Sequence, residues 1–322
     1  MPSCLVTGGA GFLGSVLADD LVRRGHEVTV VDLPGRAPLI PAETGIRTIA
    51  ADLALLSKDG MRRMVAGRDV IFHFAYASTP ASSLASPQTE RDANIAPSET
   101  IIEACLAEGV RKLVFPSTGS LYGPWKGRPF RESDPASPVT PYGASKLVVE
   151  NLIIAAGRRG LDFTILRPGS AYGPGQDPRS SLGVVTAFLF RCLAGEPLRI
   201  YGSGEVRRDF TFAGDIVRCA VAAMNRTAGG IIQVSSGIGT SVLEVADMCA
   251  RMTGISVPRQ FLEGRPSDRQ DIILDNGLEK EVFGFSPTPL REGMERTLRW
   301  LRTGPIAPPT AGRGARLPSG AS

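Results

Sequence analysis

The sequence contains only two histidines in 322 residues, His26 and His73. Many acid–base mechanisms and most zinc sites depend on histidine. His26 stands in the turn-like stretch 24–27, and His73 lies inside an apolar run. We therefore expect His73 to pack or to hydrogen-bond within a sheet. An enzyme built on this chain has to use another group for proton transfer.

Cysteine is also scarce, with five residues at positions 4, 105, 192, 219 and 249. Their wide spacing excludes a Cys-x-x-Cys metal or redox unit, so we predict reduced core cysteines and no metal site. Long apolar runs are absent, because nowhere do about 18 uncharged apolar residues follow one another. No signal-peptide pattern precedes the first strand-like segment. These absences favour a cytoplasmic location.

A strong charge of one sign is missing as well. The 36 basic and 32 acidic residues leave a net charge of +4. Residues 303–322 hold Arg313 and Arg316, no acid and many Gly and Pro residues, so we expect a disordered tail there. The rest of the chain is nearly neutral, which argues against a nucleic acid or a membrane surface as a partner.

The chain does contain a regular alternation of short apolar, β-branched runs with helix-length amphipathic segments. The runs lie at 4–6, 28–31, 70–72, 113–115 and 163–166, and the amphipathic segments at 12–24, 92–108 and 142–157. This alternation predicts an α/β protein with a doubly wound parallel sheet of the Rossmann type.

Beyond about residue 170 the alternation loosens, and Gly and Pro become frequent. We expect a smaller, irregular C-terminal region that adds a second wall to a cleft. The Rossmann domain is assigned to 1–170, with 209–236 returning to it. The substrate-binding region is assigned to 171–208 and 237–302.

A glycine-rich loop at 7–14 follows the first strand-like run and opens the first helix, with glycines at 8, 11 and 14. Such glycines let the backbone approach a pyrophosphate at a helix N-terminus. Asp32 ends the second strand-like run and would accept hydrogen bonds from adenosine ribose hydroxyls, which favours NAD over NADP. Arg36 could serve a 2′-phosphate or simply be solvated. A tight turn in another α/β protein is the alternative for the whole loop.

A second pattern combines a hydroxyl-rich stretch at 117–122 with the helix that opens at 140–146. Tyr142 and Lys146 are four residues apart and therefore lie on one helical face. That spacing is common on exposed helices by itself. Together with the glycine loop it points to a phenol used as a base beside an ammonium group.

The ordered set of these motifs resembles the extended short-chain dehydrogenase/reductase family, in its sugar-nucleotide epimerase/dehydratase branch. The resemblance runs from the glycine loop to about Leu301. Further marks that carry it are Ala51-Asp52-Leu53, His73-Phe74-Ala75, Asn94, Ser117-Thr118, Tyr122-Gly123, 141–146, Leu166-Arg167-Pro168, Tyr172-Gly173-Pro174 and Arg208-Asp209-Phe210.

The resemblance implies NAD as the cofactor and Thr118, Tyr142 and Lys146 as the catalytic residues. A tyrosine with an ordinary pKa near 10 needs roughly 4 kcal/mol of help to act near neutrality, which Lys146 and the nicotinamide charge would supply. Asp52 would lie near the adenine or cap a turn, and Asn94 would bridge backbone near the cofactor or cap a helix. The implied cofactor-binding residues are Gly8, Gly11, Phe12, Leu13, Gly14, Asp32, Asp52, Leu53, Phe74, Ala75, Ala77, Asn94, Tyr142, Lys146 and Pro168.

The residues after Thr118 bear on the reaction. Dehydratases and decarboxylases of the family carry an acid there, whereas this chain has Gly119 and Ser120. We therefore expect a nucleotide-sugar 4-epimerase that retains NAD. A dehydrogenase or ketoreductase acting on a nucleotide sugar or a small polyol acid is the alternative. A non-catalytic cofactor-binding protein is a third possibility.

The resemblance also implies substrate residues and an assembly. Thr118, Ser170, Arg208, Arg265 and Asp268 match positions that hold the substrate, although Ser170 stands where epimerases usually have Asn. We expect a homodimer formed through 92–108 and 142–157. The apolar residues that suit this interface, or equally the core, are Leu147, Val148, Leu152 and Ile153.

Overall fold

The computed structural model describes residues 1–36, 45–180, 183–226, 230–264 and 270–304. The expected substrate residues Arg265 and Asp268 and nearly all of the expected tail lie outside these ranges.

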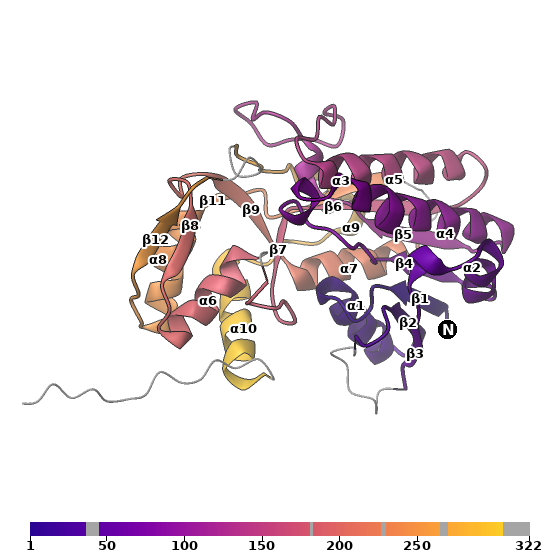
Figure 1. The fold of residues 1–322 in the computed structure, drawn as a ribbon, viewed down its shortest axis with the longest axis horizontal. Coiled ribbons are helices and arrows are strands. Elements are labelled where there is room, and N and C mark those ends of the chain that lie inside the picture. The colour runs from indigo at the N-terminus through magenta and orange to yellow at the C-terminus, as the bar shows by residue number, and fades with distance from the viewer. Residues whose placement is uncertain (37–44, 181–182, 227–229, 265–269, 305–322) are drawn as a thin grey trace, which may run out of the picture.

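A seven-stranded sheet forms the larger part of the molecule, with strand order β10-β6-β5-β4-β1-β2-β3 (Figure 1). Every neighbouring pair in it is parallel. This arrangement confirms the predicted doubly wound parallel α/β fold. The strands are β1 (Ser3–Thr7), β2 (Glu27–Asp32), β3 (Arg47–Ala50), β4 (Val70–His73), β5 (Lys112–Pro116), β6 (Phe163–Pro168) and β10 (Gly230–Val234).

Helices cover both faces of this sheet, because successive side chains of a strand point to opposite sides. Cys4 and Val6 of β1 face one layer, which contains α1 (Phe12–Arg23) and α7 (Ala213–Ala223). Leu5 faces the other layer. That layer contains α2 (Lys58–Val65), α4 (Ala96–Ala107) and α5 (Pro141–Gly157).

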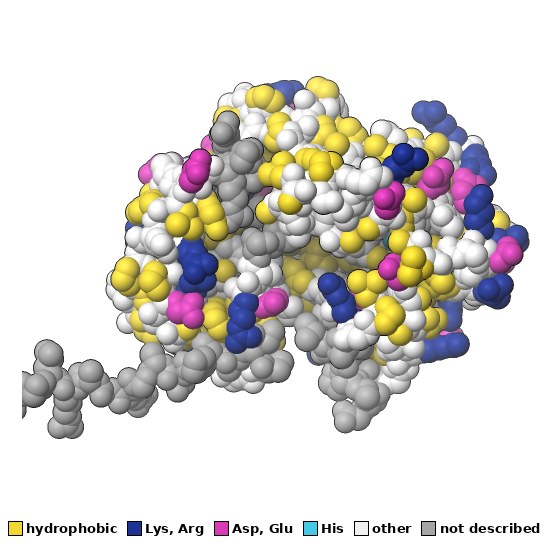
Figure 2. Space-filling view, in the orientation of Figure 1, with side chains coloured by type: hydrophobic (Ala, Val, Ile, Leu, Met, Phe, Trp, Pro, Cys, Tyr) yellow, Lys and Arg dark blue, Asp and Glu magenta, His cyan; other side chains and the backbone are white. Residues whose placement is uncertain are grey.

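The smaller part has its own hydrophobic core, which lies to the left of the main sheet in Figure 1. A three-stranded sheet contains β7 (Ser170–Tyr172), β9 (Arg207–Phe212) and β11 (Gly239–Ser241), and β8 (Leu198–Tyr201) pairs with β12 (Arg259–Leu262). The helices of this part are α6 (Val184–Ala194), α8 (Val242–Thr253) and α10 (Leu290–Thr303). The surface is hollowed between the two parts (Figure 2).

Two segments differ from the sequence expectation. The expected helix over 92–108 is interrupted: α3 (Pro87–Thr89) and a π-helical segment, η4 (Glu90–Ile95), precede α4. The helix α9 (Gly277–Phe283), from the range assigned to the substrate region, packs on β10 and adds Leu278, Val282 and Phe283 to the α1–α7 layer.

The scarce residues behave as the sequence predicts. All five cysteines are buried and reduced. His73 is buried and hydrogen-bonded on both ring nitrogens, to Thr7 Oγ1 at 2.9 Å and to Ser98 Oγ at 2.8 Å. Among the described residues, no helix has the length and apolar character needed to span a bilayer.

Candidate active site

A cleft of about 750 Å³ lies between the carboxyl ends of the parallel strands and the smaller part. In doubly wound sheets this edge is where ligands bind. The cleft brings together residues that the sequence places far apart. Predicted site residues that line it are Gly8, Gly11, Phe12, Leu13, Gly14, Phe74, Thr118, Tyr142, Lys146, Pro168, Ser170 and Arg208.

The glycine loop closes one end of the cleft and has no room for side chains. Gly8 has φ of +69°, and a Cβ there would lie 2.6 Å from the backbone nitrogen of Ala75. A Cβ on Gly14 would lie 2.1 Å from the Gly8 carbonyl oxygen. Helix α1 begins at Phe12 with no side-chain cap at Gly11, so its first-turn N–H groups are available to a phosphate. The loop therefore fits the pyrophosphate of a dinucleotide.

Thr118 and Tyr142 both line the cleft, where the Thr118 side chain lies close enough to affect the ionisation of the Tyr142 phenol. Thr118 lies two residues after the end of β5 and caps η5 (Gly119–Leu121) by accepting a hydrogen bond from the Ser120 N–H at 3.0 Å. Tyr142 stands in the first turn of α5, which Thr140 caps at the Gly143 N–H. Capping at both places fixes the two hydroxyls relative to each other.

Lys146 follows one turn later on α5 and is only 4% exposed. Its ammonium group donates a hydrogen bond to the Pro116 carbonyl oxygen at 2.8 Å. It also lies 3.7 Å from the ring centre of Tyr76 and 4.4 Å from that of Phe115. These aromatic faces attract a cation that burial has removed from water.

Burial shifts the pKa values of Tyr142 and Lys146 in opposite directions. Desolvation, followed by the nearby Glu90 charge, raises the pKa of the Tyr142 phenol, while the hydrogen bond from Thr118 lowers it. Desolvation lowers the pKa of Lys146 to about 7, against the carboxylates of Glu150 and Glu90, which raise it. A positive charge brought into the cleft would therefore favour the phenolate form of Tyr142.

Several expected cofactor residues stand behind the cleft wall rather than on its surface. Asp32 accepts the N–H groups of Ala10 and Leu33, each at 2.8 Å, and so ties β2 to the glycine loop. Asp52 caps η2 (Leu53–Leu55) by accepting the Ala54 N–H, which is the turn-capping alternative. Leu53, Ala75, Ala77 and Asn94 also lie outside the surface that lines the cleft.

Asn94 bridges backbone near the cleft rather than capping a helix. Its Oδ1 atom accepts the Ala77 N–H at 2.7 Å, and its amide donates to Ser78 and Glu90, each at 3.0 Å. The loop that follows β4 is thereby held against η4. The roles of Asp32, Asp52 and Asn94 toward a cofactor stay predictions.

The opposite wall of the cleft is basic. Arg208 of β9 donates to the carbonyl oxygens of Arg207 and Gln270, and Ser170 lies on the neighbouring strand β7. Arg179, Arg191 and Arg199 line the same cleft, and no described residue that lines it is Asp or Glu. A wall of arginines without carboxylates suits an anionic ligand such as a diphosphate.

Sequence reasoning did not single out several of these residues. Arg199 and Tyr201 alternate with the buried Leu198 and Ile200 along β8, so the period-two pattern of this strand could have indicated them. Ser117 lines the cleft, and its buried Oγ atom has no hydrogen-bond partner among the described residues.

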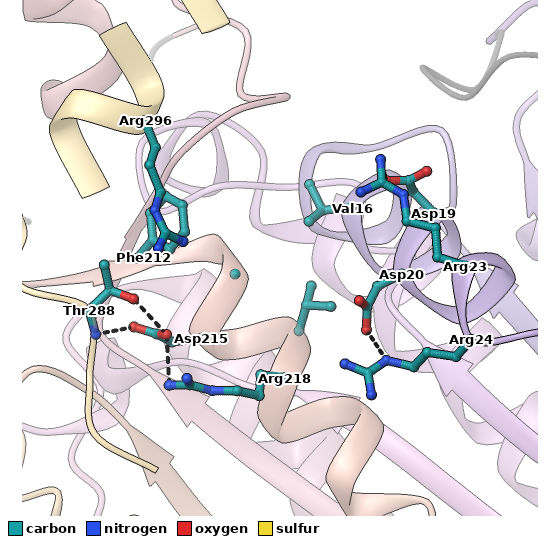
Figure 3. Close-up of a pocket in the computed structure, with 12 residues that line it drawn as sticks. Val16, Asp19, Asp20, Arg23, Arg24, Phe212, Asp215, Arg218, Thr288 and Arg296 are labelled. Carbon is teal, nitrogen blue, oxygen red and sulfur yellow. Dashed lines mark hydrogen bonds and ion pairs between the residues drawn. The ribbon is translucent and has the colours of Figure 1, made fainter. Parts of the chain in front are cut away.

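A second hollow of about 330 Å³ lies between α1, α7 and α10 (Figure 3). Its charges are already satisfied: Asp215 accepts from Thr288 and Arg218, and Arg24 pairs with Asp20 at 2.7 Å. Further pairs join Arg23 to Asp19 and Arg296 to Glu292. These charged groups are paired with one another, so the second hollow offers few groups to a ligand. The glycine-loop cleft is therefore the candidate active site.

Two curated relatives match almost the whole chain. A UDP-glucose 4-epimerase of Mycolicibacterium smegmatis is 34% identical over 307 residues, which cover 92% of this chain and 98% of the relative. A UDP-N-acetyl-alpha-D-glucosaminuronate decarboxylase of Bacillus cytotoxicus is 32% identical over 335 residues, covering 93% and 97%.

A solved structure agrees with these relatives. The Thermus thermophilus UDP-glucose 4-epimerase in complex with NAD is 32% identical, covers 94% of this chain and 99% of its own, and superposes with a TM-score of 0.86. The family model for the NAD dependent epimerase/dehydratase family matches residues 4–235. These findings confirm the resemblance seen in the sequence and the prediction of NAD as the cofactor. The chain is an enzyme of the NAD-dependent epimerase/dehydratase family.

Proposed function

We propose that this enzyme is a nucleotide-sugar 4-epimerase that retains its NAD. The observation that carries the proposal is the composition of the cleft. Thr118, Tyr142 and Lys146 supply what hydride and hydroxyl-proton transfer require, whereas no described residue that lines the cleft offers a carboxylate. Elimination needs an additional acid, so dehydration is disfavoured.

Tyr142, Thr118 and Lys146 have different roles in the proposed reaction at one sugar carbinol. The glycine loop with Gly8, Gly11 and Gly14 would hold NAD, which would supply reversible hydride transfer at the carbinol carbon. Tyr142 takes the hydroxyl proton on its phenolate oxygen as the hydride leaves and returns it when the hydride comes back. Thr118 holds the reacting oxygen beside Tyr142, and the Lys146 ammonium stabilises the phenolate.

The basic wall would hold the rest of the substrate. Arg208 suits the diphosphate because a guanidinium can donate two parallel hydrogen bonds to phosphate oxygens. Ser170 can donate one hydrogen bond from β7 but has a shorter reach than an asparagine. Arg265 and Asp268 are proposed to complete this subsite, and both lie outside the described residues.

The test is to incubate the purified enzyme with UDP-glucose, UDP-galactose and their N-acetyl and uronic acid forms, without added NAD. Formation of C4 isomers supports the proposal. The absence of an isomer from every substrate contradicts it. A stoichiometric absorbance change at 340 nm that requires added cofactor would instead identify a dehydrogenase or ketoreductase.

A further inference from the structure

A buried carboxylate that the proposed chemistry does not use lies directly behind the catalytic helix. Glu90 is 3% exposed and stands at the start of η4, which packs against α5. Its Oε2 atom accepts hydrogen bonds from Ser145 Oγ at 2.5 Å and from the Asn94 amide at 3.0 Å. Its Oε1 atom has no partner among the described residues.

A chain of hydroxyl groups connects this carboxylate to the wall around Lys146. The Tyr76 hydroxyl lies 2.6 Å from Ser145 Oγ, and Ser145 in turn donates to Glu90. The same Tyr76 ring lies 3.7 Å from the Lys146 ammonium and meets the Tyr142 ring edge-on at 5.5 Å. Glu90 therefore fixes, through Ser145, an aromatic ring that contacts both reactive residues.

Two carboxylates act on the charge of Lys146, and they differ in their partners. Glu150, one turn after Lys146 on α5, has the larger effect and makes a buried two-point ion pair with Arg167 of β6, at 3.0 and 2.6 Å, whereas Glu90 accepts hydrogen bonds from the neutral groups Ser145 and Asn94. On β4, burial and the Lys146 charge lower the pKa of His73 to about 3, so His73 is neutral. Tyr76 and Tyr142 carry no charge in their phenol forms.

We propose that Glu90 is a positioning residue that acts on Lys146. Its carboxylate adds a negative charge to that of Glu150 and so stabilises an ammonium group that is only 4% exposed. Its hydrogen bond to Ser145 fixes the Tyr76 ring against that ammonium. Because the same carboxylate opposes the charge of the Tyr142 phenolate, Glu90 sets the range of pH over which the pair works.

The proposal accounts for the charge of the site in both halves of the proposed reaction. Glu90 and Lys146 sum to zero. When Tyr142 is a phenolate, bound oxidised NAD would supply the positive charge that balances it. A site without Glu90 would carry an excess positive charge throughout, which is costly in a medium of low dielectric.

The test reads Lys146 directly in the purified enzyme, without added substrate or NAD. The chain has five lysines, Lys58, Lys112, Lys126, Lys146 and Lys280, so ¹³Cε-lysine NMR resolves few signals and a Lys146→Arg variant assigns the one of interest. In Glu90→Gln the titration midpoint of Lys146 should fall by about one pH unit, a tenfold change in its protonation equilibrium. The control Asp92→Asn, exposed on the same segment, should leave it unchanged.

A second variant covers the case in which Glu90→Gln does not fold. Ser145→Ala keeps the carboxylate but cuts its link to Tyr76, so the Lys146 midpoint should fall by a smaller amount, about half a pH unit. Midpoints within about 0.3 unit of the parent in the folded variants would overturn the inference.

The inference about Glu90 rests on the proposed function, because that function gives Lys146 its role beside the Tyr142 phenolate. The inference and the proposed function can nevertheless fail separately. If the midpoint falls but no sugar nucleotide is epimerised, Glu90 still acts on Lys146 and the proposed reaction is wrong. If epimerisation is found, the pH profile of kcat/KM for Glu90→Gln should move to lower pH. The reason is that removing the Glu90 charge eases ionisation of Tyr142 as well as deprotonation of Lys146.

Discussion

At the scale of single residues, Tyr142 has the central role in the proposed reaction, because it is the proposed base. Replacing it is the simplest test of that role. Tyr142→Phe keeps the ring that meets Tyr76 and removes the hydroxyl that exchanges the proton. We expect kcat to fall by about 10²- to 10⁴-fold, the usual contribution of a positioned general base. NAD content and the thermal midpoint should stay near those of the parent. A variant with parental kcat would exclude Tyr142 as the base.

Glu279 of α9 gives a second prediction, for stability. It is 1% exposed, accepts the Ser235 N–H at 3.0 Å, and burial raises its pKa to about 7. A carboxyl whose folded-state pKa is raised contributes stability that is complete below its ordinary pKa of 4.5 and is lost as pH rises through about 7. Stability should therefore decline over this window by about 3 kcal/mol from this group.

The variant Glu279→Gln should remove that decline, because an amide does not ionise. Denaturant unfolding at pH 4.5 and at pH 8 measures the difference. The matched control is Glu281→Gln, an exposed position on the same helix, which should retain the decline of the parent. If Glu279→Gln shows the same pH dependence as the parent, Glu279 does not titrate in this window.

The sequence predicted Tyr142, Lys146 and Thr118 because their chemistry depends on a short, ordered motif. It could not predict Glu90. The stretch 88–92 is polar and looks exposed, and only the π-helical segment η4 turns Glu90 inward to meet Ser145. Residues that meet across 55 positions of sequence leave no periodic signal.

At the scale of elements, the junction of β1 and α1 is the most constrained. In Gly14→Ala the new methyl would meet the Gly8 carbonyl oxygen at 2.1 Å, so the loop has to move. We expect NAD affinity to fall at least about tenfold, or about 1.4 kcal/mol, because the loop amides no longer converge on the pyrophosphate. Isothermal titration calorimetry measures this change when NAD is added to protein from which the retained NAD has been removed.

Gly109→Ala provides the control for that variant. Gly109 also has a positive φ, of +66°, but nothing lies within 4 Å of its missing Cβ. It should lose about 1–2 kcal/mol of stability through backbone strain alone and keep its NAD affinity. Equal NAD affinities in the two variants would contradict the assignment of the loop.

The sequence predicted helices and strands correctly where their burial requires a recognisable pattern of apolar residues. The strands β1, β2, β4, β5 and β6 are buried on both faces and stand out as apolar runs. The strand β3 was missed because it is an edge strand with mostly exposed side chains. The expected helix over 92–108 is divided between the π-helical segment η4 and the α-helix α4, and α4 has Pro97 in its first turn, a position that proline favours.

At the scale of the whole molecule, the expected homodimer gives a further prediction. Ile153 of α5 belongs to the core, whereas Val148 is 42% exposed and remains available for a partner. Val148→Asp should convert a particle of twice the chain's 34.1 kDa into a single chain in light scattering. Ile238→Asp, at a position 66% exposed in the smaller part, should leave the mass unchanged. A parent that is monomeric would refute the expectation.

The two parts of the molecule have separate hydrophobic cores, and this separation has a consequence for how such enzymes diversify. The helix with Tyr142 and Lys146 packs into the core of the large sheet, while the arginine-bearing wall of the cleft belongs to the core around α6, α8 and β8. A substitution that reshapes the wall therefore leaves the packing of α5 intact. The wall can thus change without a change in the helix that presents Tyr142 and Lys146, and the chain is about one third identical both to a UDP-glucose 4-epimerase and to a UDP-N-acetyl-alpha-D-glucosaminuronate decarboxylase.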